Sequence, residues 1–267
     1  MKWQLPSVSA IFFEIMYGFY LLKGVLNVLE EIRFSFFRRR LEKNEIQILE
    51  SKFPYFSRLS EKHKKEFCEK LEIVLSSKKF IGRGGIRVVS AEMEVLIGAT
   101  IVMVTFGWRR VRMPHFQKIL IYPNAYYSTI SKSYHRGEVN PKLGIIVVSW
   151  NCFLEGMTNE NDGVNLGIHE IAHALKLENQ IFYNGESEFF NPTVYQRYKM
   201  LAAAEIEKIG ADEYSFFRKA GGLNEHEFFA VSLENFFERS NEFFEYNPDL
   251  YGALVQLLRQ DPRVWVK

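Results

Sequence analysis

The sequence NLGIHEIAHALKL, residues Asn165–Leu177, contains the pattern His-Glu-x-x-His at His169, Glu170 and His173. Apolar residues recur through the segment at helical spacing, which predicts a buried helix. Two histidines four positions apart then project from one helix face, and both can present a ring nitrogen to a tetrahedral zinc ion. Glu170 follows the first histidine and lies beside the open position of such a metal, where a carboxylate can take a proton from water. The pattern predicts a zinc site with Glu170 as general base.

A third protein ligand is expected, and the sequence narrows its type. A histidine ligand shortly after His173 would need Gly at position 176 and His at 179, but these are Lys176 and Asn179, so we expect a carboxylate. The helix-like segment 224–239 places Glu227 and Glu234 on one face. The first also fits a capping box that only closes a helix end, and the second fits an acid that supports a ligand. Spacing alone also leaves open Glu178, Glu186, Glu188 and Glu205.

The remaining elements indicate an α+β fold, mainly helical with a small sheet. Charged, helix-prone sequence covers Arg33–Glu50, and a helix is predicted from 59–61 to Leu75. The run Glu94–Phe106 has the length of a buried helix, although its Thr and Val content leaves a strand open. Lys78–Ile86 is predicted to be extended chain broken by glycines, and short β-branched runs predict strands at 119–123 and 144–150.

The strand at 144–150 precedes the predicted zinc helix. In zinc peptidases an edge strand in this place often receives the substrate backbone as an added strand, which makes the segment a candidate substrate site. Its strongly apolar sequence equally fits a buried core strand.

Composition excludes several classes of protein. The chain has 267 residues with 34 basic and 32 acidic side chains, a net charge of +2, which disfavours nucleic-acid binding. Its two cysteines, Cys68 and Cys152, can form neither a disulfide framework nor a four-thiolate zinc site, and such sparse use suits a reducing compartment. Cys152 is not expected to be a nucleophile, because the metal supplies one.

The amino terminus is the most apolar part of the chain. Residues 8–29 are long enough to cross a membrane but are interrupted by Glu14, Lys23 and Asn27, which leaves two alternatives: a membrane anchor, or a docked or dimer-forming helix. If the segment spans a membrane, the basic cluster at 38–40 would keep the remaining chain on the cytoplasmic side. We expect a cytoplasmic protein, with anchoring to the inner face of the membrane left open. The expected organisation is an apolar helix over 1–32 and a single catalytic domain over 33–267.

Four segments resemble the Mlc titration factor A family of zinc-dependent peptidases: ILIYP at 119–123, GVNLGIHEIAH at 163–173, EFFAVSLENFFER at 227–239 and PDLYGALVQLLRQDP at 248–262. The resemblance extends from about Leu96 to Pro262. It implies a gluzincin-like, zincin-type fold and aminopeptidase-type cleavage of a peptide or protein substrate. It also implies one zinc ion per chain with Glu227 as the third ligand. In some bacteria such proteins bind the glucose-responsive repressor Mlc.

The sequence departs from this family at one functional position. Members often carry a tyrosine seven residues before the ligand glutamate, where it could stabilise the tetrahedral intermediate, but position 220 is Ala. Candidates for a replacement donor are Tyr214, Tyr195 and His226, and Glu234 is a candidate supporting residue. The sequence therefore favours a zinc peptidase. The alternative is a zinc-containing binding protein that titrates a transcriptional regulator, with weak or no peptidase activity.

Overall fold

The computed structural model describes residues 39–109, 113–128, 132–181 and 190–265. By its contacts the chain divides into two units, Met1–Arg40 and Leu41–Lys267. Nearly all described residues belong to the second unit, and the predicted apolar helix at 8–29 lies outside them. Within the described part of the chain, no helix has both the length and the apolar character needed to cross a membrane.

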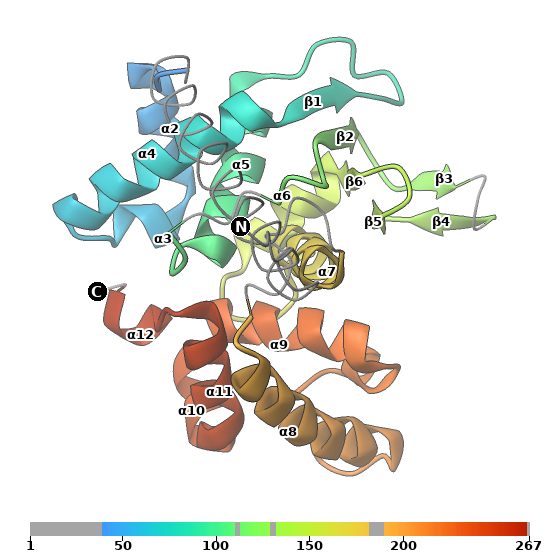
Figure 1. Cartoon of the computed structure of the whole chain (residues 1–267). Helices are drawn as coiled ribbons and strands as arrows, with labels where there is room; N and C mark the ends of the chain where they lie inside the picture. Colours follow the sequence, from blue (N-terminus) through green and yellow to red (C-terminus); the bar gives the residue numbers. More distant parts are fainter. Residues whose placement is uncertain (1–38, 110–112, 129–131, 182–189, 266–267) are drawn as a thin grey trace, which may run out of the picture. The chain divides into compact units, whose positions relative to one another are not determined.

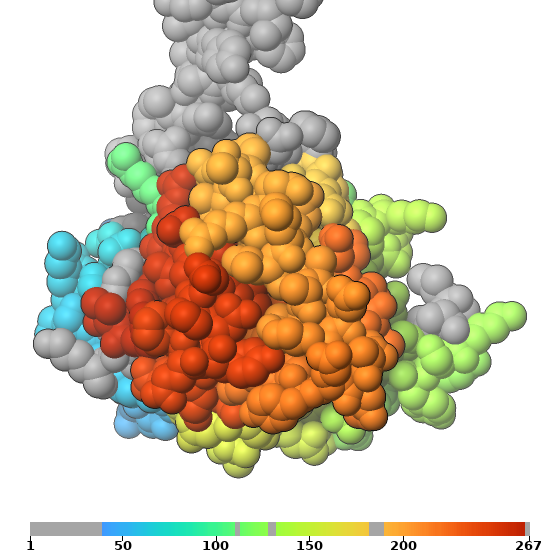
Figure 2. Space-filling view, turned by 90° about the horizontal axis from the view of Figure 1, so that it is seen from below, coloured from blue at the N-terminus to red at the C-terminus, as the bar shows by residue number. Residues whose placement is uncertain are grey.

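The second unit is mainly helical with a small mixed sheet (Figure 1). Its helices are α2 (Lys43–Lys52), α3 (Pro54–Ser57), α4 (Glu61–Ser77), α5 (Ala91–Thr105), α6 (Trp150–Thr158), α7 (Leu166–Gln180), α8 (Pro192–Gly210), the 3-10 helix η1 (Lys219–Gly222), α9 (Glu225–Glu238), α10 (Ser240–Tyr246), α11 (Pro248–Leu258) and α12 (Pro262–Trp265). Its strands are β1 (Lys79–Gly82), β2 (Lys118–Tyr122), β3 (Tyr126–Ser128), β4 (Ser133–His135), β5 (Gly137–Asn140) and β6 (Ile145–Ser149). The helices from α8 onward, coloured orange to red, gather on one side of this unit (Figure 2).

Local sequence signals account for where the helices begin. The side chain of Ser60 accepts a hydrogen bond from the main chain of His63 at the start of α4, which confirms the predicted helix there. Prolines occupy the first turns of α3, α8 and α11, where the missing N–H has no helical partner. Within the described part of the charged segment 33–50, the helix begins at Lys43, after a capping box between Glu42 and Glu45. Residues 39–42 are not helical.

The run Glu94–Phe106, which the sequence allowed to be either a helix or a strand, lies mostly in the helix α5. It is buried over nearly its whole circumference, so its apolar residues show no single face. Its polar β-branched residues are satisfied inside the helix, because the hydroxyls of Thr100 and Thr105 donate to the carbonyls of Leu96 and Ile101 at 3.0 and 2.6 Å. Helices α2, α4 and α7 pack against α5, which places it at the centre of the apolar core.

The main sheet has the strand order β1-β2-β6-β5. Strands β1, β2 and β6 are parallel, and β5 is antiparallel to β6. Both predicted strands are confirmed, but the edge position considered for 144–150 is wrong. Strand β6 is paired on both sides and almost fully buried, as its unbroken apolar sequence requires. The short strand β5 forms the edge of the sheet, and both β5 and β6 contact helix α7.

Candidate metal centre

Helix α7 carries His169, Glu170 and His173 on a rigid base. Asn165 caps its start, with the side-chain oxygen 3.0 Å from the main-chain nitrogen of Ile168. The opposite face of the helix is buried in the core. The two histidine side chains are about 15% exposed, so solvent reaches them while their backbone stays fixed.

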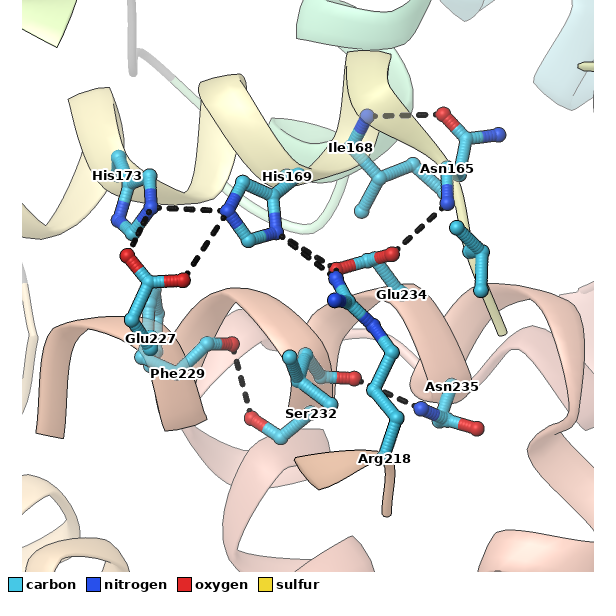
Figure 3. Close-up of polar contacts among 12 residues, drawn as sticks. Asn165, Ile168, His169, His173, Arg218, Glu227, Phe229, Ser232, Glu234 and Asn235 are labelled. Atoms are coloured by element: carbon cyan, nitrogen blue, oxygen red, sulfur yellow. Dashed lines mark hydrogen bonds and ion pairs between the residues drawn. The ribbon is translucent and has the colours of Figure 1, made fainter. Parts of the chain in front are cut away.

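Helix α9 packs against α7 and brings Glu227 to the two histidines (Figure 3). Asn224 caps α9, but it accepts from the main-chain N–H groups of His226 and Glu227. The Glu227 carboxylate instead contacts the imidazoles: Oε2 lies 3.4 Å from His169 Nε2 and Oε1 lies 3.3 Å from His173 Nε2. The capping pattern and the contact with the histidines coexist, because one uses the main chain and the other the side chain.

The donor atoms fit a single metal ion. The Nε2 atoms of His169 and His173 are 3.1 Å apart, and the other two separations are 3.3 and 3.4 Å. Two donors that bind one zinc ion at about 2.0–2.1 Å in tetrahedral directions are separated by about 3.3 Å. Among the described residues, His169, His173 and Glu227 are the group of three or more His, Cys, Asp and Glu side chains whose ligand atoms come close enough to hold a metal ion.

Without a metal, protons occupy this cluster. Burial lowers the pKa of His169, but hydrogen bonds to Glu227 and Glu234 outweigh it and raise the pKa to about 9. Hydrogen bonds from His169 and His173 hold the pKa of Glu227 well below its usual range. A metal ion would take the place of the shared proton, because imidazole binds metals in its neutral form.

Glu170 lies next to this cluster and is 5% exposed. Burial raises the pKa of Glu170 to about 8. The negative charges of Glu227, Glu234 and Glu138 raise it further, whereas the positive charge of His169 lowers it. Its side chain packs directly over Gly137 on the edge strand β5, where a β-carbon added to the glycine would come within 2.4 Å of the Glu170 Oε1 atom. The contact between helix α7 and strand β5 thus depends on the absence of a side chain at position 137.

Glu234 lies behind His169 and is fully buried. Its Oε1 accepts from His169 Nδ1 at 2.7 Å and from Arg218 Nη2 at 2.6 Å, and its Oε2 accepts from the main-chain nitrogen of Asn165 at 2.8 Å (Figure 3). A hydrogen bond at Nδ1 leaves Nε2 of His169 as the nitrogen that is available to a metal ion. Glu234 can orient His169 from this place, and its supporting role stays a prediction.

The candidate replacement donors are placed differently. Tyr214 is 83% exposed and its ring contacts Tyr246 on α10. Tyr195 packs against Phe190. His226 is exposed, and desolvation together with the charges of Lys176 and His173 lowers its pKa.

The other acids left open by spacing lie elsewhere or outside the described residues. Glu178 accepts from the main-chain nitrogen of His115. Glu205 is buried and binds Tyr246, Asn247 and Lys208. Glu186 and Glu188 are outside the described residues.

Sequence reasoning missed three contributors to the site. Asn165 holds Glu234 through its main chain, Arg218 binds Glu234 from the segment before η1, and Gly137 makes room for Glu170. The Asn before the helix carried a capping signal, but neither the glycine nor the arginine lies in a pattern that distinguishes it from an ordinary loop or strand residue.

Comparison with known proteins identifies a relative and a family for this chain. A protein of Synechocystis sp. that is described as uncharacterized is 26% identical over 245 residues, which are 84% of this chain and 85% of the relative. The family model described as glucose-regulated metallo-peptidase M90 matches residues 30–259. This confirms the resemblance to the Mlc titration factor A family. The chain belongs to the glucose-regulated metallopeptidase family M90.

Proposed function

We propose that this metallopeptidase uses one zinc ion held by His169, His173 and Glu227, and that it hydrolyses peptide bonds with Glu170 as general base. The observation that carries the proposal is that the nearest ligand atoms of His169, His173 and Glu227 are 3.1–3.4 Å apart. The Glu170 carboxylate lies beside these three side chains. Two neutral nitrogens and one carboxylate oxygen are the donor set of many catalytic zinc sites, which keep a fourth position open. Bound zinc would supply a Lewis acid that polarises a carbonyl and makes water acidic near neutral pH.

The chain's own residues would then perform the proton transfers. Glu170 takes a proton from the attacking water and can return it to the leaving amine. Its burial supports this role, because a carboxylate with a raised pKa both accepts and releases a proton near neutral pH.

The position of β5 at the edge of the sheet supports a mode of substrate binding. An extended peptide that pairs with this edge would lie beside Glu170, because Gly137 on β5 touches that side chain. We propose aminopeptidase-like cleavage of the bound peptide, as the sequence resemblance implies.

The test combines metal analysis with hydrolysis of chromogenic amides. Free aminoacyl amides, the same amides with an acetylated amino group and an internally quenched peptide separate exopeptidase from endopeptidase activity. Glu170→Gln should keep one zinc per chain and lose at least ~10²-fold in kcat/KM. Glu155→Gln, at an exposed position on α6, is the matched control and should match the parent.

The ligand assignment has its own comparison. Glu227→Ala removes a donor and should lower zinc occupancy more strongly than Glu234→Ala. A parent protein that binds zinc but hydrolyses none of the amides would contradict the peptidase proposal. Undiminished activity of Glu170→Gln would contradict only the general-base assignment.

A further inference from the structure

Glu234 is a buried carboxylate that makes an ion pair with Arg218, a residue outside its own helix. It is 0% exposed, and a charge at such a site is costly unless it has ionic or hydrogen-bonding partners. Its three donors come from three segments: His169 from α7, the main chain of Asn165 from the loop before α7, and Arg218 from the loop before η1. The position of this carboxylate is therefore set by tertiary packing rather than by its own helix.

Arg218 supplies the positive charge among these donors. Its Nη2 atom lies 2.6 Å from Glu234 Oε1, the short separation of a charge-assisted hydrogen bond. The segment that follows it, η1, packs against both α8 and α9, which fixes where the guanidinium enters the site. The arginine Nε atom is buried and has no hydrogen-bond partner within the described residues.

The same nitrogen of Arg218 lies 3.3 Å from Nδ1 of His169. Both atoms are donors when Nδ1 carries its proton, so this separation is that of two donors that share the acceptor Oε1. In Figure 3 the guanidinium and the imidazole approach Glu234 together, while Nε2 of the same imidazole faces His173 and Glu227. Arg218 is therefore connected to the candidate metal ligand through one shared oxygen atom.

We propose that Arg218 is a positioning residue for the metal site: it holds Glu234, and Glu234 in turn holds the ring of His169 in the orientation that presents Nε2. The inference rests on the proposed zinc site and extends it to a residue outside the ligand helices. Loss of the guanidinium leaves Oε1 with one donor, and the buried carboxylate can then rotate and take the imidazole with it. Supporting partners of metal-bound histidines typically affect metal affinity by about 10–100-fold.

The experiment measures zinc affinity of the full chain by competition with a chromophoric chelator. Arg218→Met keeps an unbranched apolar stem but removes the guanidinium and its charge, and it should weaken zinc binding by at least about tenfold. Arg218→Lys keeps the charge without the planar fork and should recover part of the loss. The matched control is Arg197→Met, which breaks an exposed ion pair between α8 and Asp249 and should bind zinc like the parent.

A double-mutant cycle separates positioning through Glu234 from general packing. If Arg218 acts through Glu234, the substitution Arg218→Met should add little to the loss already caused by Glu234→Gln. Additive losses, or a zinc affinity of Arg218→Met within twofold of the parent, would overturn the inference. If Arg218→Met does not fold, the same cycle with Arg218→Lys decides between the two outcomes.

The two proposals fail in different ways. A parent that binds zinc, shows the Arg218 coupling and hydrolyses no amide contradicts the peptidase function but supports the positioning role. A parent that hydrolyses amides and tolerates Arg218→Met without loss of zinc affinity contradicts the positioning role alone. A parent that binds no zinc overturns both.

Discussion

The contact between Gly137 and Glu170 predicts a specific loss of activity in Gly137→Ala. A β-carbon at position 137 would lie 2.4 Å from Oε1, 2.5 Å from Cδ and 2.6 Å from Cγ of Glu170. Ordinary contacts of this kind begin near 3.4 Å, so the glutamate must move by about 1 Å. The strand cannot easily yield instead, because Gly137 is in register with Val148 in the paired sheet.

A displacement of this size is enough to disturb proton transfer. Misplacing a reacting group by about 1 Å can cost on the order of 10²-fold in rate. We expect kcat/KM of Gly137→Ala to fall by about that factor while zinc affinity stays within about twofold of the parent. The clash involves Glu170 and none of the three candidate metal ligands, so metal binding and catalysis should separate.

The assay compares amide hydrolysis and zinc content of Gly137→Ala with those of the parent. Gly252→Ala in α11 is the control, because a β-carbon there meets nothing within 4 Å. In a Glu170→Gln background the alanine should cause little further loss, since the group that it displaces is already inactive. A folded, zinc-loaded Gly137→Ala protein with parental activity would refute the reasoning that Glu170 acts from its position over β5.

Three further predictions concern protons and stability. Zinc should displace a proton from His169 near pH 7, because the pKa of this residue in the metal-free site is about 9. Calorimetry in buffers of different ionisation enthalpy measures the number of protons released. Zinc binding without proton release at pH 7 would contradict this prediction. The folded-state pKa values of His169 and Glu170 are raised to about 9 and about 8, so the native metal-free protein holds protons that the unfolded chain has released. Its Tm should therefore fall as pH rises from 6.5 to 8, and a constant or rising Tm over this range would contradict the prediction. Above pH 8 the lowered pKa values of Lys78 and Lys176, about 7 and about 8, act in the opposite direction. Gln260→Ala should lower the free energy of unfolding in urea by about 1–3 kcal/mol, because the buried side chain of Gln260 makes hydrogen bonds with Tyr55 and with two main-chain carbonyls of α5. A change below about 0.5 kcal/mol would indicate that water replaces these hydrogen bonds.

Much of the local structure could be predicted because its causes lie close together in sequence. The start of α4 follows from Ser60, and the helix α7 follows from a cap at Asn165 and a continuous apolar pattern. The strand β5 was not predicted, because Gly-Glu-Val-Asn is too short and too polar to carry a strand pattern. Its place at the sheet edge depends on β6, which pairs with it, and a strand's neighbours are not encoded in its own residues.

The sequence by itself determined the two candidate metal-ligating histidines and the glutamate between them, since a helix of known pitch converts their spacing into a common face. The spacing of residues left Glu227 and Glu234 as the two main alternatives, together with four other acids, and only the resemblance to a known family pointed to Glu227. The tertiary structure placed the first beside the histidines and buried the second behind His169, since the packing of α9 on α7 decides which turn of one helix meets which turn of the other. The contributions of Gly137 and Arg218 exist only in the folded chain, because each acts on a side chain of another element through contacts that only folding creates.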